Sequence, residues 1–239
     1  MSALNGRSHA RRTTRLRRVG VAVALLACVG LAACTAAETS APASMADTAT
    51  VPSLPGSGEL DAGTYLVTGF TVPFEITVPE GWESEGWFVF RSDSEEAGVA
   101  VNFQVSGFVP ADACDWQGAI TEVVDPSSEA FAAAMAGQTS TATTPAVEIV
   151  LGGFSGVEFD HAVESDVDIL ECDERKICLH SDSANNCARW HSSVDEHETY
   201  RVVDLKGERV VIAVLGNVSV DPAVTEEARS VFDSIEFAP

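Results

Sequence analysis

The feature that most limits the fold is a series of short apolar runs with a period of two, which begins near Glu59. In residues 99–105 the valines and Phe103 share one side of the run, while Asn102 and Gln104 lie on the other. Such alternation predicts strands with one buried face. Residues 209–215 are apolar at successive positions, which predicts a central strand. We expect the other strands at 65–67, 74–78, 87–90, 146–151, 155–159, 200–205 and 234–237.

Two helices are expected among these strands. Each begins with Asp-Pro, at Asp125-Pro126 and Asp221-Pro222, where the aspartate can cap the helix and proline suits its first position. An apolar stripe at Val224, Ala228, Val231 and Phe232 follows the second start. The predicted fold class is therefore α+β, a mostly antiparallel β-sheet with two helices packed on it. An all-β fold would require one of the helices to be absent.

The N-terminal segment has the pattern of an export signal. Six of the 14 Lys+Arg residues lie before residue 19, and the uncharged, mostly apolar run 19–33 follows them. This run is shorter than the roughly 20 residues of a spanning helix, so residues 1–33 are predicted to be a secretory signal peptide. The pairs Arg11-Arg12 and Arg17-Arg18 leave open whether export is by the Sec or the twin-arginine route.

The end of this segment, Leu31-Ala32-Ala33-Cys34, resembles the lipobox of bacterial lipoproteins. The resemblance implies that Cys34 is acylated with palmitate and that the protein is anchored by lipid to the cell membrane, on its extracytoplasmic face. A second candidate, Leu25-Leu26-Ala27-Cys28, has a bulky residue two places before the cysteine. Cleavage as an ordinary signal peptide and an uncleaved anchor are the alternatives.

Composition divides the rest of the chain into a linker and a domain. Residues 34–58 are rich in Ala, Ser, Thr and Pro, which predicts a flexible tether after the lipidated cysteine. Residues 59–239 are then a single globular domain. Removal of residues 1–33 leaves 8 Lys+Arg against 36 Asp+Glu, a charge of −28. Such a charge excludes nucleic acid as a partner, because phosphate binding needs clustered cations.

Several segments of the domain resemble a group of uncharacterised exported proteins of high-GC Gram-positive bacteria. They are FTVPFEITVPEGW (70–82), Cys-Asp-Trp (114–116), GFSGVEFD (153–160) and ARSVFDSIEF (228–237). The opening and closing motifs are also loosely similar to PsbP/Mog1-like α/β sandwich domains. These resemblances imply an α+β fold in an exported lipoprotein that binds partners, and they bring no assigned reaction.

Four cysteines remain in the exported domain: Cys114, Cys172, Cys178 and Cys187. An even number outside the cytoplasm predicts two disulfides, for which three pairings exist. We favour Cys114–Cys172 with Cys178–Cys187, because the second bond would close a polar loop that is an insertion relative to the resembling group. A zinc site of three of these cysteines with His191 is the alternative, although its spacing differs from that of a zinc finger.

Other motifs are weak signals of chemistry. Gly153-Phe154-Ser155-Gly156-Val157 lacks the last glycine of a nucleophile elbow and precedes a strand, so we interpret it as a turn. The acidic run 164–174 is interpreted as solvated in preference to a calcium site. His161 and His191 have no nucleophile partner in the sequence. Trp82, Trp87, Trp116 and Trp190 are interpreted as packing residues in preference to a ligand-stacking platform.

No catalytic residue, metal site or cofactor is therefore predicted. The favoured function is a non-enzymatic binding domain held outside the cell membrane, with an envelope protein or a small ligand as its partner. An envelope hydrolase whose groups converge in the fold, and a structural lipoprotein, are the alternatives. A deep pocket lined by titratable groups with shifted pKa values would favour the enzyme, and a shallow apolar patch would favour the binder.

Overall fold

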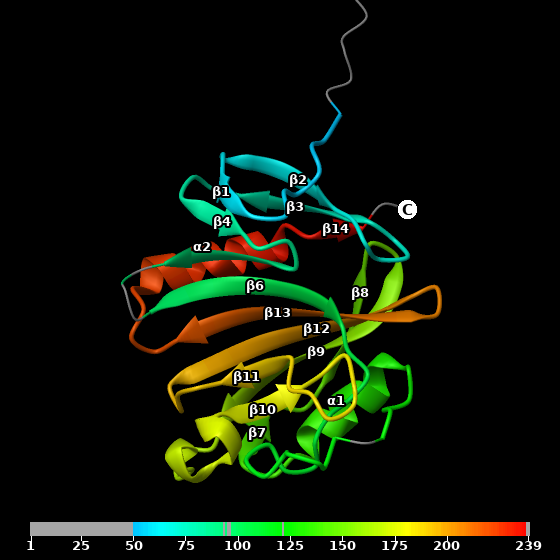
Figure 1. Ribbon diagram of the computed structural model, residues 1–239. Coiled ribbons are helices and arrows are strands. Elements are labelled where there is room, and N and C mark those ends of the chain that lie inside the picture. The colour runs from blue at the N-terminus through cyan, green and yellow to red at the C-terminus, as the bar shows by residue number, and fades with distance from the viewer. Residues whose placement is uncertain (1–49, 93, 95–96, 121, 238–239) are drawn as a thin grey trace, which may run out of the picture. The chain divides into compact units, whose positions relative to one another are not determined.

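The computed structural model describes residues 50–92, 94, 97–120 and 122–237. The predicted signal peptide, Cys28, Cys34 and most of the predicted linker lie outside these residues. Residues 48–239 form one compact unit, drawn in Figure 1. The linker was predicted to end at residue 58, but the chain joins the domain earlier. Leu54 donates its N–H to Leu66 O and Leu66 donates to Pro52 O, both at 2.8 Å.

A nine-stranded sheet is the centre of this unit (Figure 1). Its strands pair in the order β1-β4-β5-β6-β13-β12-β9-β7, and β8 also pairs with β9. All of these pairs are antiparallel. The strands are β1 (Gly58–Leu60), β4 (Trp82–Ser84), β5 (Phe88–Ser92), β6 (Gly98–Val105), β7 (Thr141–Thr143), β8 (Val147–Leu151), β9 (Phe154–Val163), β12 (Glu196–Leu205) and β13 (Glu208–Asn217).

Two smaller sheets and two helices accompany the large sheet. The helices are α1 (Ser128–Ala136) and α2 (Pro222–Asp233), and two short 3-10 turns lie at η1 (Ile169–Glu171) and η2 (Asp173–Arg175). One small sheet has the order β14-β3-β2, and the other is the hairpin β10-β11. Their strands are β2 (Gly63–Val67), β3 (Phe74–Val78), β10 (Ile177–His180), β11 (Arg189–His191) and β14 (Glu236–Phe237).

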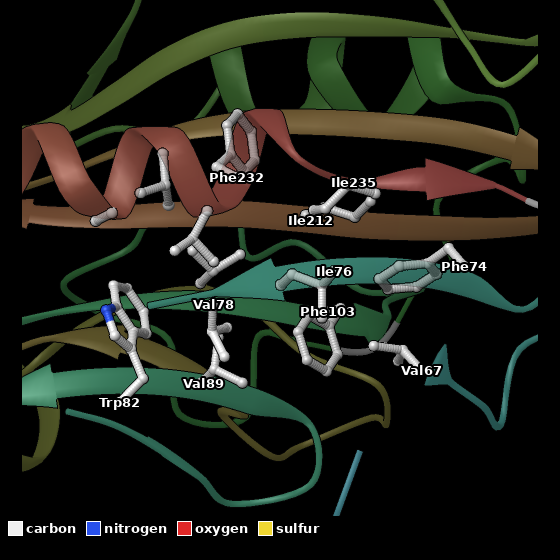
Figure 2. Packing of buried hydrophobic residues seen from close by; sticks show 14 of the residues in the cluster. Val67, Phe74, Ile76, Val78, Trp82, Val89, Phe103, Ile212, Phe232 and Ile235 are labelled. Carbon is white, nitrogen blue, oxygen red and sulfur yellow. The ribbon is translucent and has the colours of Figure 1, made fainter. Parts of the chain in front are cut away.

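The two faces of the large sheet have different covers. We call the first the α2 face, because α2 packs there against β6 and β13 together with β3. Its core is mainly apolar, and Figure 2 shows Phe74, Ile76 and Phe103 close to one another in it. We call the second the hairpin face, where α1 packs on β9 and β12 and a second core includes residues of β10. Alternation along β12 and β13 assigns successive residues to opposite cores.

The predicted fold class is confirmed: the chain is α+β, mostly antiparallel, with two helices and two disulfides. Strand β13 is central, between β12 and β6, as its continuous apolar run predicted. Helix α2 has Asp221 as its N-cap, Pro222 in its first turn and the predicted buried stripe. The disulfides join Cys114 to Cys172 and Cys178 to Cys187, which is the pairing we favoured.

Two expectations for local structure were wrong. Helix α1 begins two residues later than predicted, because its N-cap is Ser127 in place of Asp125; the Ser127 side chain accepts a hydrogen bond from Ala130 N. Asp125 instead accepts a bond from Ser127 N, which forms a turn before the helix. The cysteine-bearing segment was predicted to be a loop, but it contains the β10–β11 hairpin. Each of these strands is too short for a periodic pattern to reveal it.

Candidate functional site

The hairpin face contains a buried cluster of polar side chains. Glu198 and Tyr200 alternate along β12 and both point away from the α2 core. His161 on β9 is the register partner of Glu198. Arg189 and His191 come from β11 above them. We call these five residues, together with His180 of β10, the Glu198 cluster.

Glu198 holds this cluster together. Its Oε1 accepts a hydrogen bond from Arg189 Nε at 2.6 Å and also contacts Arg189 Nη2. The Tyr200 hydroxyl donates to Oε2, and His191 Nε2 lies 3.6 Å from Oε1. The Glu198 side chain has no exposed surface, and that of Arg189 is 13 % exposed. This is a buried, hydrogen-bonded ion pair, the arrangement that compensates best for the desolvation of both charges.

The pKa values of Glu198 and Tyr200 are shifted in opposite directions. Burial alone would raise the pKa of Glu198, but the charge of Arg189 and the contact with His191 hold it well below its ordinary value. Burial and the Glu198 charge together raise the pKa of Tyr200 well above its ordinary value. At neutral pH, Glu198 is therefore a carboxylate and Tyr200 remains a hydrogen-bond donor.

Two histidines of the cluster are neutral at pH 7. Burial lowers the pKa of His161 to about 4 and that of His180 to about 3, and in both the Glu198 charge opposes the effect. Both ring nitrogens of His161 lack a hydrogen-bond partner among the described residues. The ring of His180 contacts Gln104 Nε2 at 3.2 Å from its Nδ1. Both rings pack edge-on against Tyr200, so they serve as core residues.

This burial limits what the cluster can do chemically. Glu198, His161, His180 and His191 are each at most 1 % exposed, so a substrate in solvent does not reach their proton-transfer atoms. Within the part of the chain that the structure describes, no three His, Cys, Asp or Glu residues are placed to hold a metal ion. The zinc hypothesis is also contradicted directly, because all of its cysteine sulfurs are in disulfides.

The carboxylates of the acidic run have local roles. Asp168 caps η1 by accepting from Leu170 N at 3.1 Å. Asp173 accepts a bond from Gln117 N at 2.7 Å, and Glu174 pairs with Lys176 at 2.7 Å. Each of these carboxylates bonds to a different partner, so the acidic run stabilises the surface loops and does not converge on one site. Ser155 of the elbow-like motif is exposed on β9 after the Gly152–Gly153 turn, as interpreted from the sequence.

Two surface hollows lie beside the Glu198 cluster, and both are lined by Trp87 and Ala188. We call the two hollows together the Trp87 groove. The first has a volume of about 430 Å³ and includes Arg189, Trp190, Ser192, Glu196 and Asn217 in its lining. The second has a volume of about 350 Å³ and is completed by Gln104, Val105 and Asp182. Arg189 therefore belongs both to the groove wall and to the buried ion pair.

The tryptophans are divided between core and surface. Trp82 is fully buried, with its indole N–H donating to Glu227 Oε1 at 2.7 Å, and Trp116 is 5 % exposed. Trp87 is 47 % exposed and Trp190 is 43 % exposed, and both line the first hollow. The packing interpretation was wrong for these two. Lys176 Nζ lies 5.5 Å from the centre of the Trp190 ring, so that ring already has a cation contact.

Sequence reasoning missed Arg189, Glu198, Tyr200, His180 and Gln104. A signal was present for two of them, since extension of the β12 alternation backward from Val202 places Tyr200 and Glu198 on the same buried face. The hairpin residues had no such signal, because β10 and β11 pair with each other across the closed disulfide loop.

The chain matches no protein-family model and no curated protein. It is similar to two solved structures at low sequence identity. The first is cyanobacterial PsbP (CyanoP) from Synechocystis, with a TM-score of 0.37, 11 % identity and coverage of 76 % of this chain and 96 % of the other. The second is LpqN, involved in cell envelope biogenesis of Mycobacterium tuberculosis, with a TM-score of 0.35, 12 % identity and coverage of 75 % and 93 %.

A PsbP protein and an envelope protein are thus among the similar structures. Because both TM-scores are below 0.5, the site and function must be argued from the residues of this chain. Among the described residues, no helix is long and apolar enough to cross a membrane. Cys34, the predicted lipidation site, lies outside them.

Proposed function

We propose that the chain is an exported lipoprotein, anchored to the cell membrane through Cys34, whose domain binds a ligand in the Trp87 groove. The exposure of Trp87 at the junction of two hollows is the observation that carries the binding function. Ligand-binding clefts are typically lined by aromatic side chains together with a few polar groups. The lipobox-like Leu31-Ala32-Ala33-Cys34 and the two disulfides support the exported location.

The distribution of titratable groups favours a binder over a hydrolase. The groups with strongly shifted pKa values, Glu198, His161, His180 and Tyr200, are buried behind the groove and do not line it. Arg189 is the one member of the cluster in the wall of either hollow, and its charge is balanced by Glu198. The groove lining itself presents tryptophan rings with hydroxyl, amide and carboxylate side chains, and the groups with strongly shifted pKa values lie behind it.

A photocrosslinker at the groove tests the binding function. Val105 is 44 % exposed in the second hollow, so a benzophenone side chain at this position of the full-length protein would lie beside a bound ligand. We expect irradiation of expressing bacteria to give a discrete adduct, identified by mass spectrometry of the peptide. The matched control is the same side chain at Val150, which is 73 % exposed on β8 outside the groove. Equal adducts at both positions, or none at Val105, would contradict the proposal.

The anchor has a separate test. Labelled palmitate fed to expressing bacteria should be incorporated into the wild-type chain and not into Cys34→Ala, with Cys28→Ala as the matched control that keeps its label. Stable anchoring requires two acyl signals, so the Cys34→Ala chain should also leave the membrane fraction. Undiminished labelling of Cys34→Ala would refute lipidation at this site.

A further inference from the structure

We infer that the Trp87 groove is a site for a neutral saccharide of at least two sugar rings, one of which stacks on the Trp87 indole. This inference rests on the proposed binding function and assigns the chemical class of its ligand. A sugar ring has apolar C–H faces and a rim of hydroxyl groups. It is therefore recognised by aromatic faces flanked by hydrogen-bonding side chains, and the groove provides both.

Trp87 provides a fixed aromatic surface. Its backbone carbonyl accepts a hydrogen bond from Phe103 N at 3.0 Å, which holds it beside β6. Its ring meets that of Phe88 edge to face, with the ring centres 4.5 Å apart. These contacts restrain the indole and leave nearly half of the residue's surface open to the groove. A ligand that stacks on it would therefore lose little binding energy to ordering of the protein.

The polar lining matches hydroxyl groups. Gln104 and Asp182 line the second hollow, and Ser192, Glu196 and Asn217 line the first. Some of these side chains form a hydrogen bond within the protein through one of their polar atoms, and this bond fixes the orientation of the side chain. Asn217 Oδ1 accepts from the Ser219 hydroxyl at 2.7 Å, and Glu196 Oε1 accepts from the Ser192 hydroxyl at 3.0 Å.

Charge excludes an anionic ligand. Arg189 is the one cation in the described lining of the two hollows, and it is already paired with Glu198. Asp182 and Glu196 add carboxylates, and the whole chain carries a charge of −22. A phosphate or carboxylate ligand would meet repulsion without a compensating cation. The hydroxyl groups of a neutral sugar can bond to carboxylates and amides alike.

The size of the groove sets the length of the ligand. Its hollows of about 430 Å³ and about 350 Å³ meet at Trp87, and each is near the lower end of the range for small-ligand clefts, roughly 300–1,000 Å³. A ligand that stacks on Trp87 and enters both hollows must therefore extend beyond one ring. Disaccharides are the smallest probes that meet this condition.

Binding of disaccharides to the full-length protein tests the inference. The protein is held in a polyoxyethylene detergent, because glycoside detergents would compete for the site. Cellobiose, maltose and N,N′-diacetylchitobiose are titrated at millimolar concentrations, and tryptophan fluorescence and calorimetry report binding. We expect at least one of them to bind, and Trp87→Ala to weaken it by at least about tenfold, as a loss of ~1.4 kcal/mol would produce. Trp87→Phe should retain part of the affinity.

Leu170→Ala is the matched control, because Leu170 is 69 % exposed outside the groove and its loss should leave binding unchanged. Glucose 6-phosphate, spermidine and a proline-rich peptide are the competing probes. Binding of any of these at Trp87 in place of all three disaccharides would overturn the saccharide class. Failure of every probe would do the same, and a discrete Val105 adduct would then show that the binding function itself still holds. Loss of both the adduct and all binding would overturn both proposals.

Discussion

The two faces of the central sheet are built from the same strands but are stabilised in different ways. On the α2 face, twelve-residue α2 and the β14-β3-β2 sheet cover the strands with a mainly apolar core. The ion pairs that α2 forms there, Glu227 with Arg91 and Asp233 with Arg201, are partly exposed. On the hairpin face, nine-residue α1 covers part of the strands, and a hairpin of two short strands covers the rest. That hairpin contributes Arg189, His180 and His191 to the interior, where Glu198 and Tyr200 meet them.

The difference shows how a short hairpin, which has little apolar surface of its own, is held on a sheet by disulfides and buried polar contacts. Both disulfides connect segments of the hairpin face, and no other disulfide is present in the described chain. The α2 face depends on burial of apolar area, which is nonspecific and tolerant. The hairpin face also has an apolar core, but it depends in addition on a buried ion pair, and the loss of one partner of such a pair is strongly destabilising. The following experiments test this contrast.

Removal of the disulfides should have the largest effect. Cys114 and Cys172 are separated by 58 residues and Cys178 and Cys187 by nine. From the loop-closure entropy of the unfolded chain, replacement of the first pair by serine should cost ~4 kcal/mol of unfolding free energy, and of the second ~3 kcal/mol. Urea denaturation measures both. A cost under about 1 kcal/mol for each pair would show that the disulfides do not stabilise the hairpin face.

The buried ion pair should behave as a unit. Glu198→Gln leaves the Arg189 guanidinium buried without its counter-charge, so we expect a loss of about 3–5 kcal/mol. Replacement of both partners, Glu198→Leu with Arg189→Met, removes both desolvation costs and should recover most of that loss. Urea denaturation of the single and double variants gives the comparison. An equal loss of unfolding free energy in the single and double variants would mean that side-chain packing, and not charge pairing, determines the stability of the hairpin face.

Acid should weaken the hairpin face before the α2 face. His161 has an ordinary pKa of about 6.5 when unfolded, and burial lowers it to about 4 in the fold. The unfolded chain therefore binds more protons between these values, and stability that is complete above pH 6.5 falls as the pH decreases toward 4. For His161 alone the loss is ~3 kcal/mol, and His180 adds to it with the same sign.

Glu198 contributes only at lower pH, because its own pKa is held below the ordinary value near 4.5. The interval from pH 6.5 to 4.5 therefore reports the histidines. His161→Leu should make the dependence of unfolding free energy on pH shallower in this interval, and the slope that remains is that of His180. His197→Leu is the matched control, because His197 is exposed on the opposite side of β12 and its loss should leave the slope unchanged. A wild-type slope in His161→Leu would refute the assignment.

The helix caps should show the smallest effects, and equal ones on the two faces. Ser127 Oγ accepts from Ala130 N at 3.2 Å at the start of α1, and Asp221 Oδ1 accepts from Ala223 N at 2.8 Å at the start of α2. Substitution of either by alanine should cost ~1 kcal/mol, read from the midpoint of urea unfolding. A much larger cost for Ser127→Ala would indicate that the whole hairpin face, and not the cap alone, depends on α1.

Most of the α2 face could be predicted from the sequence, because its signals are local. The cap and stripe of α2 and the alternation of residues 74–78 and 99–105 each lie within one element. The hairpin face could not be predicted in the same way. Arg189 and His191 belong to a strand of three residues, and their burial follows from pairing with Glu198, which is close to them only in the fold.

The candidate site shows the same division. The sequence identified four tryptophans and could not say which were exposed. Trp82 stands between Gly81 and Glu83 and is buried, whereas Trp87 begins an apolar run and is exposed, so the local sequence did not predict burial. Only the packing of β4, β5 and the hairpin placed Trp82 in the core and Trp87 on a groove.

By itself the sequence determined the α+β class, the strand alternation and the α2 helix. These features depend on neighbours along the chain, where periodicity, caps and short motifs act. Only the tertiary structure decided where the polar residues of the hairpin face lie and where the groove opens. Burial and pairing of a charged side chain depend on residues brought together from β9, β10, β11 and β12, and no single segment encodes that meeting.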